Sequence, residues 1–163
     1  TARPATLADS LFLLRLRNDA ATVAAARRQQ VVREDEHAAW LANCVVNPDR
    51  ALMIVIRRGR RLGTYRLDGV GSTVVEVSLT VAPEWRGRGL ARQIIALALR
   101  HARRHGYAGA AVYAHVRAEN TPSLIAFLHN RFVPHAILAE FVLLKGGGAM
   151  AKKKPKPPKP KPY

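Results

Sequence analysis

The chain has 163 residues, of which 48% are hydrophobic, so it is long enough to bury the core of one domain. Its formal net charge is +16 and it has a single cysteine, which excludes an internal disulfide and a metal site built from several cysteines. No apolar run approaches the roughly 20 residues that span a bilayer, and the first residues lack the pattern of a signal peptide. We therefore expect a cytoplasmic protein, with Cys44 as a buried structural thiol.

The positive charge is concentrated near the end of the sequence. Six of the seven lysines lie in the Lys/Pro tract 152–161, which follows Gly146-Gly-Gly148. Because prolines disfavour both helix and sheet, we predict a folded domain over 1–145 and a flexible, disordered tail over 146–163. The lysines of this tail favour a weak contact with RNA or another polyanion. A solubilising or incidental extension is the alternative.

The N-terminal part of the chain reads as a short strand followed by helices. Apolar residues recur at helical spacing there, and polar turn sequences separate the segments. Arg17-Asn18-Asp19 ends one helix and Asn47-Pro48-Asp49 ends another. In chain order, the pattern predicts an edge strand over 2–6 and helices over 8–16, 20–30 and 34–43.

The remaining segments alternate between strands and helices. Arg58-Gly59-Arg60 is a hairpin signal, and Pro83 ends a run typical of a β-strand. Gly106 suits the end of a helix, where a left-handed residue is common. We expect strands over 52–56, 61–67, 73–81, 110–116 and 137–144, and helices over 88–105 and 121–130. This order predicts an α/β (α+β) fold with a mixed, mostly antiparallel central sheet flanked by helices.

The turn between strand 73–81 and helix 88–105 carries the strongest functional signal. Its glycines allow the backbone to come close to a ligand, and the first N–H groups of the helix have no partner within it. These N–H groups and the positive end of the helix dipole favour binding of a diphosphate. Arg86, Arg88 and Arg92 add positive charge around the turn.

The spacing of this turn matches neither of two common nucleotide-binding loops. The chain has no Gly-x-x-x-x-Gly-Lys-Ser/Thr sequence, and Arg92 stands where a Gly-x-Gly-x-x-Gly loop needs its third glycine. Arg86-x-x-Gly89-x-Ala91 instead resembles the acetyl-CoA signature Gln/Arg-x-x-Gly-x-Gly/Ala of the GCN5-related N-acetyltransferase (GNAT) superfamily. An ordinary strand-to-helix turn with a basic surface is the alternative.

A second segment is also similar to this superfamily. Asn120 opens helix 121–130, and Arg131-Phe132 stands where GNAT proteins have a closing Gly-Phe pair. Asn120 suits a helix N-cap by its own chemistry, and by resemblance its side chain would also bond the pantetheine arm. The resemblance is clearest over residues 52–144 and implies a GNAT fold with a splayed strand pair.

The resemblance implies acetyl-CoA as the acetyl donor and no metal. In this family the strand before the turn stops pairing with the next strand, and its freed backbone groups bind pantetheine and the thioester. Those backbone groups would belong to Leu79 and Val81. The complete set of cofactor-binding residues expected from the resemblance is Leu79, Val81, Arg86, Gly87, Arg88, Gly89, Leu90, Ala91, Arg92, Asn120 and Phe127.

Three side chains are candidates for proton transfer. Glu76 alternates onto a strand face that also carries hydroxyl residues, where it could draw a proton from an amine through water. A charge on the solvated side of the strand is the alternative. Many GNAT enzymes have a tyrosine at the position of Phe127, where it protonates the leaving thiolate. In this chain either another hydroxyl or water would do so, or CoA would leave as the thiolate. The candidate hydroxyls are Tyr113 and Ser123.

Arg17-Asn18-Asp19 and His37-x-x-Trp40 resemble a GNAT subgroup that acetylates nucleotide-linked amino sugars. An aromatic face suits a sugar or a base, and arginines suit a diphosphate. Packing of Trp40 in the core, with His37 near the surface, is the alternative. We expect the acceptor to be bound by Arg17, Asn18, His37 and Trp40.

The sequence thus predicts an N-acetyltransferase in which a primary amine attacks acetyl-CoA directly in a ternary complex. The expected acceptor is a nucleotide-linked amino sugar or another small amine. One alternative is a protein N-terminal or lysine acetyltransferase of the ribosomal-protein type. Another is a non-catalytic nucleic-acid-binding module with a GNAT-like shell, although the basic runs lack the interleaved aromatic residues used for base stacking. The resemblance leaves a homodimer open.

Overall fold

The computed structural model describes residues 1–69, 72–105 and 110–146, and within them seven strands form one sheet. The strand order is β1-β2-β3-β4-β5-β7-β6, and every neighbouring pair is antiparallel except β4 and β5. This confirms the predicted mixed, mostly antiparallel sheet. The strands are β1 (Ala2–Pro4), β2 (Arg50–Arg57), β3 (Arg60–Asp68), β4 (Val74–Val81), β5 (Ala111–Arg117), β6 (Phe132–Leu138) and β7 (Phe141–Gly146).

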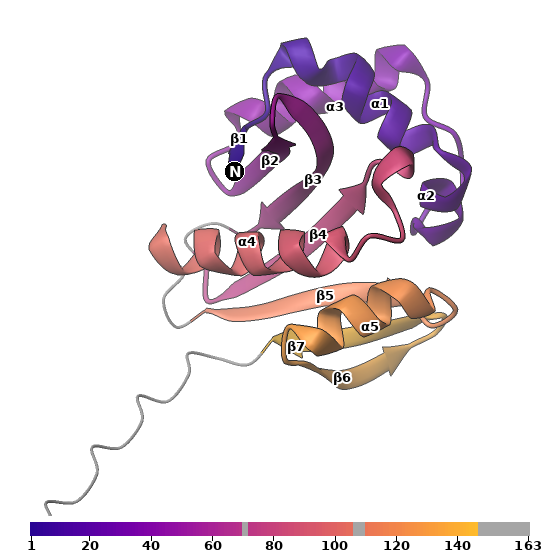
Figure 1. The fold of residues 1–163 in the computed structure, drawn as a ribbon, viewed down its shortest axis with the longest axis vertical. Coiled ribbons are helices and arrows are strands. Elements are labelled where there is room, and N and C mark those ends of the chain that lie inside the picture. Colours follow the sequence, from indigo (N-terminus) through magenta and orange to yellow (C-terminus); the bar gives the residue numbers. More distant parts are fainter. Residues whose placement is uncertain (70–71, 106–109, 147–163) are drawn as a thin grey trace, which may run out of the picture.

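Helices cover both faces of the sheet (Figure 1). The α-helices are α1 (Ser10–Asn18), α2 (Ala20–Ala25), α3 (Glu34–Val46), α4 (Leu90–Arg104) and α5 (Thr121–His129), with short 3-10 helices η1 (Leu7–Asp9) and η2 (Pro83–Trp85). None of the helices in the described residues is long and apolar enough to cross a membrane.

Strand alternation divides the hydrophobic core into two clusters. On β2, Met53 and Val55 belong to the cluster that also holds buried residues of α4 and α5. Leu52 and Ile54 belong to the other cluster, which holds buried residues of α1 and α3. Since neighbouring side chains on a strand point to opposite faces, one hydrophobic strand supplies both layers. Cys44 lies in the second cluster, and burial raises the pKa of its thiol, as expected for a structural cysteine.

The splayed strand pair is present. β4 and β5 pair in parallel only from Val74 opposite Ala111 to Glu76 opposite Tyr113. Beyond these residues the two strands diverge toward the side of the molecule that carries α2 (Figure 1). β4 remains paired with β3 as far as Val81, so the gap opens on one side of β4 only.

Two predicted elements differ from the structure. The single strand expected over 137–144 is in fact the end of β6, a turn, and most of β7. Pro134 argues against a strand, but β6 is the edge strand and its pairing shifts register between Pro134 and Ala136, where a proline is tolerated. The helix expected over 20–30 ends at Ala25. Gly106 lies outside the described residues. So do residues 147–163, which are nearly all of the predicted tail.

Candidate functional site

A cleft of about 910 Å³ lies between α2, the end of β4, the loop before α4 and the start of α5. It brings together almost all of the residues predicted to bind the cofactor: Leu79, Val81, Arg86, Gly87, Gly89, Leu90, Ala91, Arg92 and Asn120. Two predicted residues do not line it. Arg88 points instead over the ring of Trp85, 5.0 Å from its centre, and Phe127 is buried in the core against Phe132.

The last residues of β4 direct backbone groups toward the cleft. The Ala82 N–H donates to the Leu62 carbonyl at 2.9 Å, and Val81 lies opposite Gly63 on β3. In an antiparallel ladder, successive residues direct their N–H and C=O groups alternately toward and away from the neighbouring strand. The backbone groups of Leu79 and Val81 are therefore directed away from β3, toward the side where β5 has separated.

The loop before α4 has the conformation that glycine makes accessible. Gly87 and Gly89 have φ angles of 71° and 69°, in the left-handed region. A Cβ atom added to either glycine would meet no atom within 4 Å, so the backbone borders open space. α4 begins at Leu90, and its first N–H groups have no intrahelical partner. The loop and the helix start therefore present donors and a positive dipole end to the cleft, which suits an anionic group.

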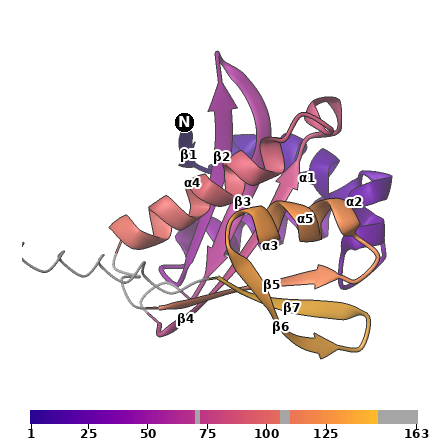
Figure 2. The same ribbon diagram turned by 60° about the horizontal axis from the view of Figure 1, so that its bottom comes forward.

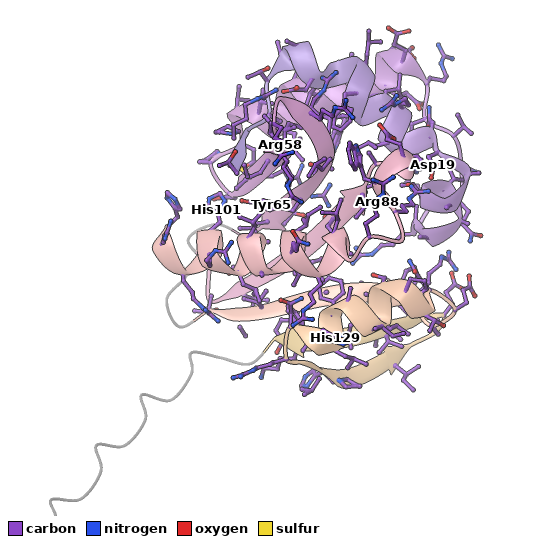
Figure 3. The ribbon with its side chains drawn as sticks, in the orientation of Figure 1. Asp19, Arg58, Tyr65, Arg88, His101 and His129 are labelled. Carbon is purple, nitrogen blue, oxygen red and sulfur yellow. The ribbon has the colours of Figure 1, made fainter. Side chains whose placement is uncertain are left out.

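Arg86 connects this loop to the segment between α1 and α2. Its guanidinium donates to the Asp19 carboxylate at 2.6 Å, to the Thr22 hydroxyl at 3.2 Å and, through Nε, to the Val81 carbonyl at 3.2 Å. Asp19 in turn accepts the Thr22 N–H at 3.1 Å and so caps α2. The Arg86 guanidinium holds the pKa of Asp19 below its usual range. Figure 3 labels Asp19 beside this loop.

The start of α5 forms the opposite wall. The Asn120 side chain accepts the Ser123 N–H at 3.3 Å, which confirms the predicted N-cap. Both residues line the cleft. Tyr113, the other predicted hydroxyl, does not line the cleft. Its ring lies 5.5 Å from that of His135, and the Lys145 ammonium lies 5.7 Å from the centre of its ring.

Glu76 takes part in a cluster at the point where β4 and β5 separate. Its Oε1 accepts from Arg27 Nη2 at 2.8 Å and lies 3.1 Å from His115 Nδ1. His115 was not among the site residues predicted from the sequence. The register of β4 and β5 places the two side chains together. Tyr113 lies opposite Glu76, and His115 is two residues further along β5, on the same face of the sheet. Neither Glu76 nor His115 lines the cofactor cleft, and both are part-buried.

The four residues predicted to bind the acceptor lie on α1 and α3, and none of them lines the cleft. His37 is only 3% exposed, and its ring lies 5.3 Å from that of Trp40. Burial, and secondarily Arg17, lowers the pKa of His37. One nitrogen of Arg17 (Nη1) and one of His37 (Nδ1) are buried without a hydrogen-bond partner among the described residues. Asn18 holds the chain after α2, because its side chain both donates to and accepts from the Val32 backbone at 2.8 Å.

A family model described as the acetyltransferase (GNAT) family matches residues 11–131. The chain belongs to the GNAT acetyltransferase family. Among curated proteins, none matches this sequence significantly.

Solved structures of GNAT proteins share the fold. A ribosomal-protein-alanine N-acetyltransferase from Brucella melitensis is 24% identical, with a TM-score of 0.72, and the match covers 89% of this chain and 96% of that one. A spermidine N-acetyltransferase from Vibrio cholerae, in complex with CoA and spermine, is 18% identical with a TM-score of 0.77, covering 89% and 92%. These similarities establish the GNAT architecture of the chain.

The described residues of this GNAT domain fit a diphosphate-bearing donor. The open space at Gly87 and Gly89 allows close approach to the backbone, and the cleft continues from there to the backbone groups of Leu79. The described residues contain no group of three or more His, Cys, Asp or Glu side chains arranged to hold a metal ion.

Proposed function

We propose that the protein transfers an acetyl group from acetyl-CoA to a primary amine by direct attack within a ternary complex. The observation that carries this proposal is that β4–β5 pairing ends at Glu76 and Tyr113, so Leu79 and Val81 beyond it line the same cleft as the glycine loop. The loop and the start of α4 hold the diphosphate, and the Leu79 and Val81 backbone holds the pantetheine arm and the thioester. Acetyl-CoA supplies an acyl group that is already activated, so the chain has to position the amine and stabilise developing negative charge.

Glu76 and His115 act as the proton acceptor of the attacking amine. Arg27 and His115 both contact Glu76 Oε1, an arrangement that fixes the imidazole by its Nδ1 atom and leaves Nε2 as the acceptor. Imidazole is well suited to proton transfer near neutral pH. The amine reaches the thioester through the gap between the strands, and its proton leaves toward this pair, directly or through one water molecule.

Ser123 is the better placed of the two candidate acids. It lines the cleft at the start of α5, whereas Tyr113 lies against His135 and Lys145. Phe127 does not take over the role of a tyrosine acid, since it has no hydroxyl and is buried. The departing thiolate is therefore protonated by Ser123 or by water.

The proposed acceptor is an amine that carries negative charge, with a nucleotide-linked amino sugar as the leading example. The formal net charge of +16 repels polycations, and Arg27 and Arg117 lie around the gap between β4 and β5. Among the described residues, Arg17 and His37 each have a buried nitrogen without a hydrogen-bond partner, and the Trp40 ring lies beside that of His37. Acetylation of protein amines is the second candidate acceptor class.

An acetyl-transfer assay with a panel of amines tests the proposal. Release of free CoA thiol is followed with uridine-diphosphate amino sugars, alanine-terminated peptides and spermidine, each with acetyl-CoA. We expect the highest kcat/KM with an amino-sugar nucleotide. Preference for peptides or for spermidine would overturn the acceptor assignment alone, whereas absence of transfer to every amine would overturn the catalytic assignment.

A further inference from the structure

A second hollow, of about 590 Å³, lies on the other side of the α4 N-terminus from the cofactor cleft. Trp85 and Leu90 line both and form the ridge between them. The remaining walls come from the β2–β3 hairpin, from Arg88 in the loop before α4 and from Gln93 on α4. Figure 2 shows this hairpin projecting past the start of α4, and Figure 3 labels one arginine on each wall, Arg58 and Arg88.

Four arginines line the hollow without any acidic residue: Arg57, Arg58, Arg60 and Arg88. The ion pairs formed within the described part of the chain involve other arginines, so these four guanidinium groups have no carboxylate partner there. The neighbouring Arg61, by contrast, has a carboxylate partner, since it lies 3.5 Å from Asp9. The hollow is therefore a concentration of uncompensated positive charge, which attracts anions.

Trp85 holds two of these cations in place. The guanidinium carbon of Arg88 lies 5.0 Å from the centre of a Trp85 ring, and that of Arg60 lies 6.0 Å from it. Such cation–π contacts restrict long side chains before any ligand arrives, so less conformational entropy is lost on binding. Arg58 adds a second unusual feature: its φ angle is 49°, in a two-residue turn where asparagine or glycine is preferred. Turn chemistry does not account for an arginine at this position.

We propose that this hollow binds the phosphate backbone of a single-stranded nucleic acid. The volume is about twenty times that of one water molecule, so a single phosphate ion would leave most of it unfilled. Arg57, Arg58 and Arg60 are exposed, and solvent weakens the attraction of an exposed cation for one small anion. A polymer compensates for this weakness, because each neutralised phosphate releases condensed counterions. A positively charged groove that follows the backbone is a common feature of surfaces that bind single strands.

This site is separate from the acetyl-transfer site. Arg57, Arg58 and Arg60 belong to the hairpin, and none of them lines the cofactor cleft. Binding of a nucleic acid in this hollow therefore does not depend on which amine is acetylated. A nucleic acid held there would lie beside the cofactor cleft, on the far side of the Trp85–Leu90 ridge.

A pair of charge-matched variants of the full chain tests the proposal. One carries Arg57→Gln, Arg58→Gln and Arg60→Gln. The control carries Arg100→Gln, Arg103→Gln and Arg104→Gln, which removes the same charge from exposed positions of α4. The probe is a labelled oligouridylate of about 12 nucleotides, within the range of known single-strand site sizes. Binding is measured by fluorescence anisotropy over a series of salt concentrations, with oligoglutamate of equal charge and CoA as competitors.

We expect the hairpin variant to lose affinity selectively. For a single strand the logarithm of the affinity falls by about 0.7 per phosphate contact for each tenfold rise in salt, so losing three contacts costs about 100-fold near 0.1 M salt. The salt slope should fall by about 2 with it, while the control changes the affinity by less than about threefold. Equal losses in the two variants would overturn the proposal and assign binding to overall charge or to the lysine tract. Displacement of the oligonucleotide by oligoglutamate or by CoA at equal concentration would also overturn it. CoA binding by the hairpin variant should be unchanged.

Discussion

The Arg86 guanidinium donates to the Asp19 carboxylate at 2.6 Å, and this contact joins the glycine loop to the residue that caps α2. Arg86 is the first residue of the signature that identifies the cofactor loop, and Asp19 ends the Arg-Asn-Asp sequence expected at the acceptor site. The glycine loop and the segment expected to bind the acceptor are therefore connected directly. Asp19 already compensates much of the charge of Arg86, so the proposed diphosphate site would depend on backbone N–H groups and Arg92.

Replacement of this pair should show energetic coupling. We expect Asp19→Asn, which preserves an N-cap, and Arg86→Gln to be non-additive by about 0.5–1 kcal/mol in the free energy of unfolding near neutral pH. The pKa of Asp19 is lowered in the folded state, so the coupling is present above the ordinary aspartate pKa and is lost as the carboxyl becomes protonated at lower pH. Urea unfolding of both single variants and the double variant measures it. Coupling of the same size in strong acid would contradict an ionic contact.

The Glu76–His115 pair should affect turnover without affecting the donor. Neither residue lines the cofactor cleft, so we expect His115→Gln to lower kcat by about 10²–10⁴-fold, the range for loss of a general base, with CoA affinity unchanged. Glu76→Gln should have a smaller effect, since it removes only the group that orients the imidazole. His105→Gln, at the exposed histidine that follows α4, is the control. A variant at His115 with normal kcat would remove this histidine from the mechanism.

Asp9 should stabilise the N-terminal part of the chain in a pH-dependent way. The carboxylate is 2% exposed and accepts two bonds of 2.7 Å from Arg3 and one of 3.0 Å from the Thr6 N–H. The Arg3 contact lowers its pKa from 3.8 to about 2. A shift of this size corresponds to about 2 kcal/mol of stability.

Because the folded-state pKa of Asp9 is depressed, its contribution is complete above the unfolded value of 3.8 and is lost as the pH falls toward about 2. We therefore expect Asp9→Asn to lower the free energy of unfolding by about 2 kcal/mol at neutral pH, and the difference from the native sequence to vanish near pH 2. Chemical denaturation at a series of pH values measures both quantities. A constant difference across this range would show that Asp9 acts through packing instead of charge.

Local sequence signals were sufficient to predict the conformation of the loop before α4. Pro83, the glycines and the apolar helix after them are consecutive, so the turn, the left-handed residues and the start of α4 follow from short-range chemistry. The N-cap at Asn120 was predictable for the same reason. The strand that bears Glu76 was also predicted, but the contact of Glu76 with His115 was not.

The features that were not predicted depend on contacts between distant segments. His115 meets Glu76 only through the parallel register of β4 and β5, and Trp85 meets Arg60 only because the hairpin approaches the loop before α4. The chain after Ala25 leaves the helix because side chains from elsewhere satisfy its backbone: Arg117 donates to the Ala26 carbonyl. Helix propensity alone does not contain this information.

The central claim is that the loop from Arg86 to Ala91 binds the diphosphate of the acetyl donor, and calorimetric titration of CoA tests it most directly. Gly89→Asn places a side chain in the cleft while keeping a residue that tolerates a left-handed backbone, and Gly59→Asn makes the same change at φ 74°, also with no atom within 4 Å. We predict saturable one-to-one binding by the native chain and by Gly59→Asn, and an affinity at least about tenfold weaker for Gly89→Asn, which corresponds to about 1.4 kcal/mol. No heat of binding with the native chain, or equal affinities for the two variants, would contradict the account.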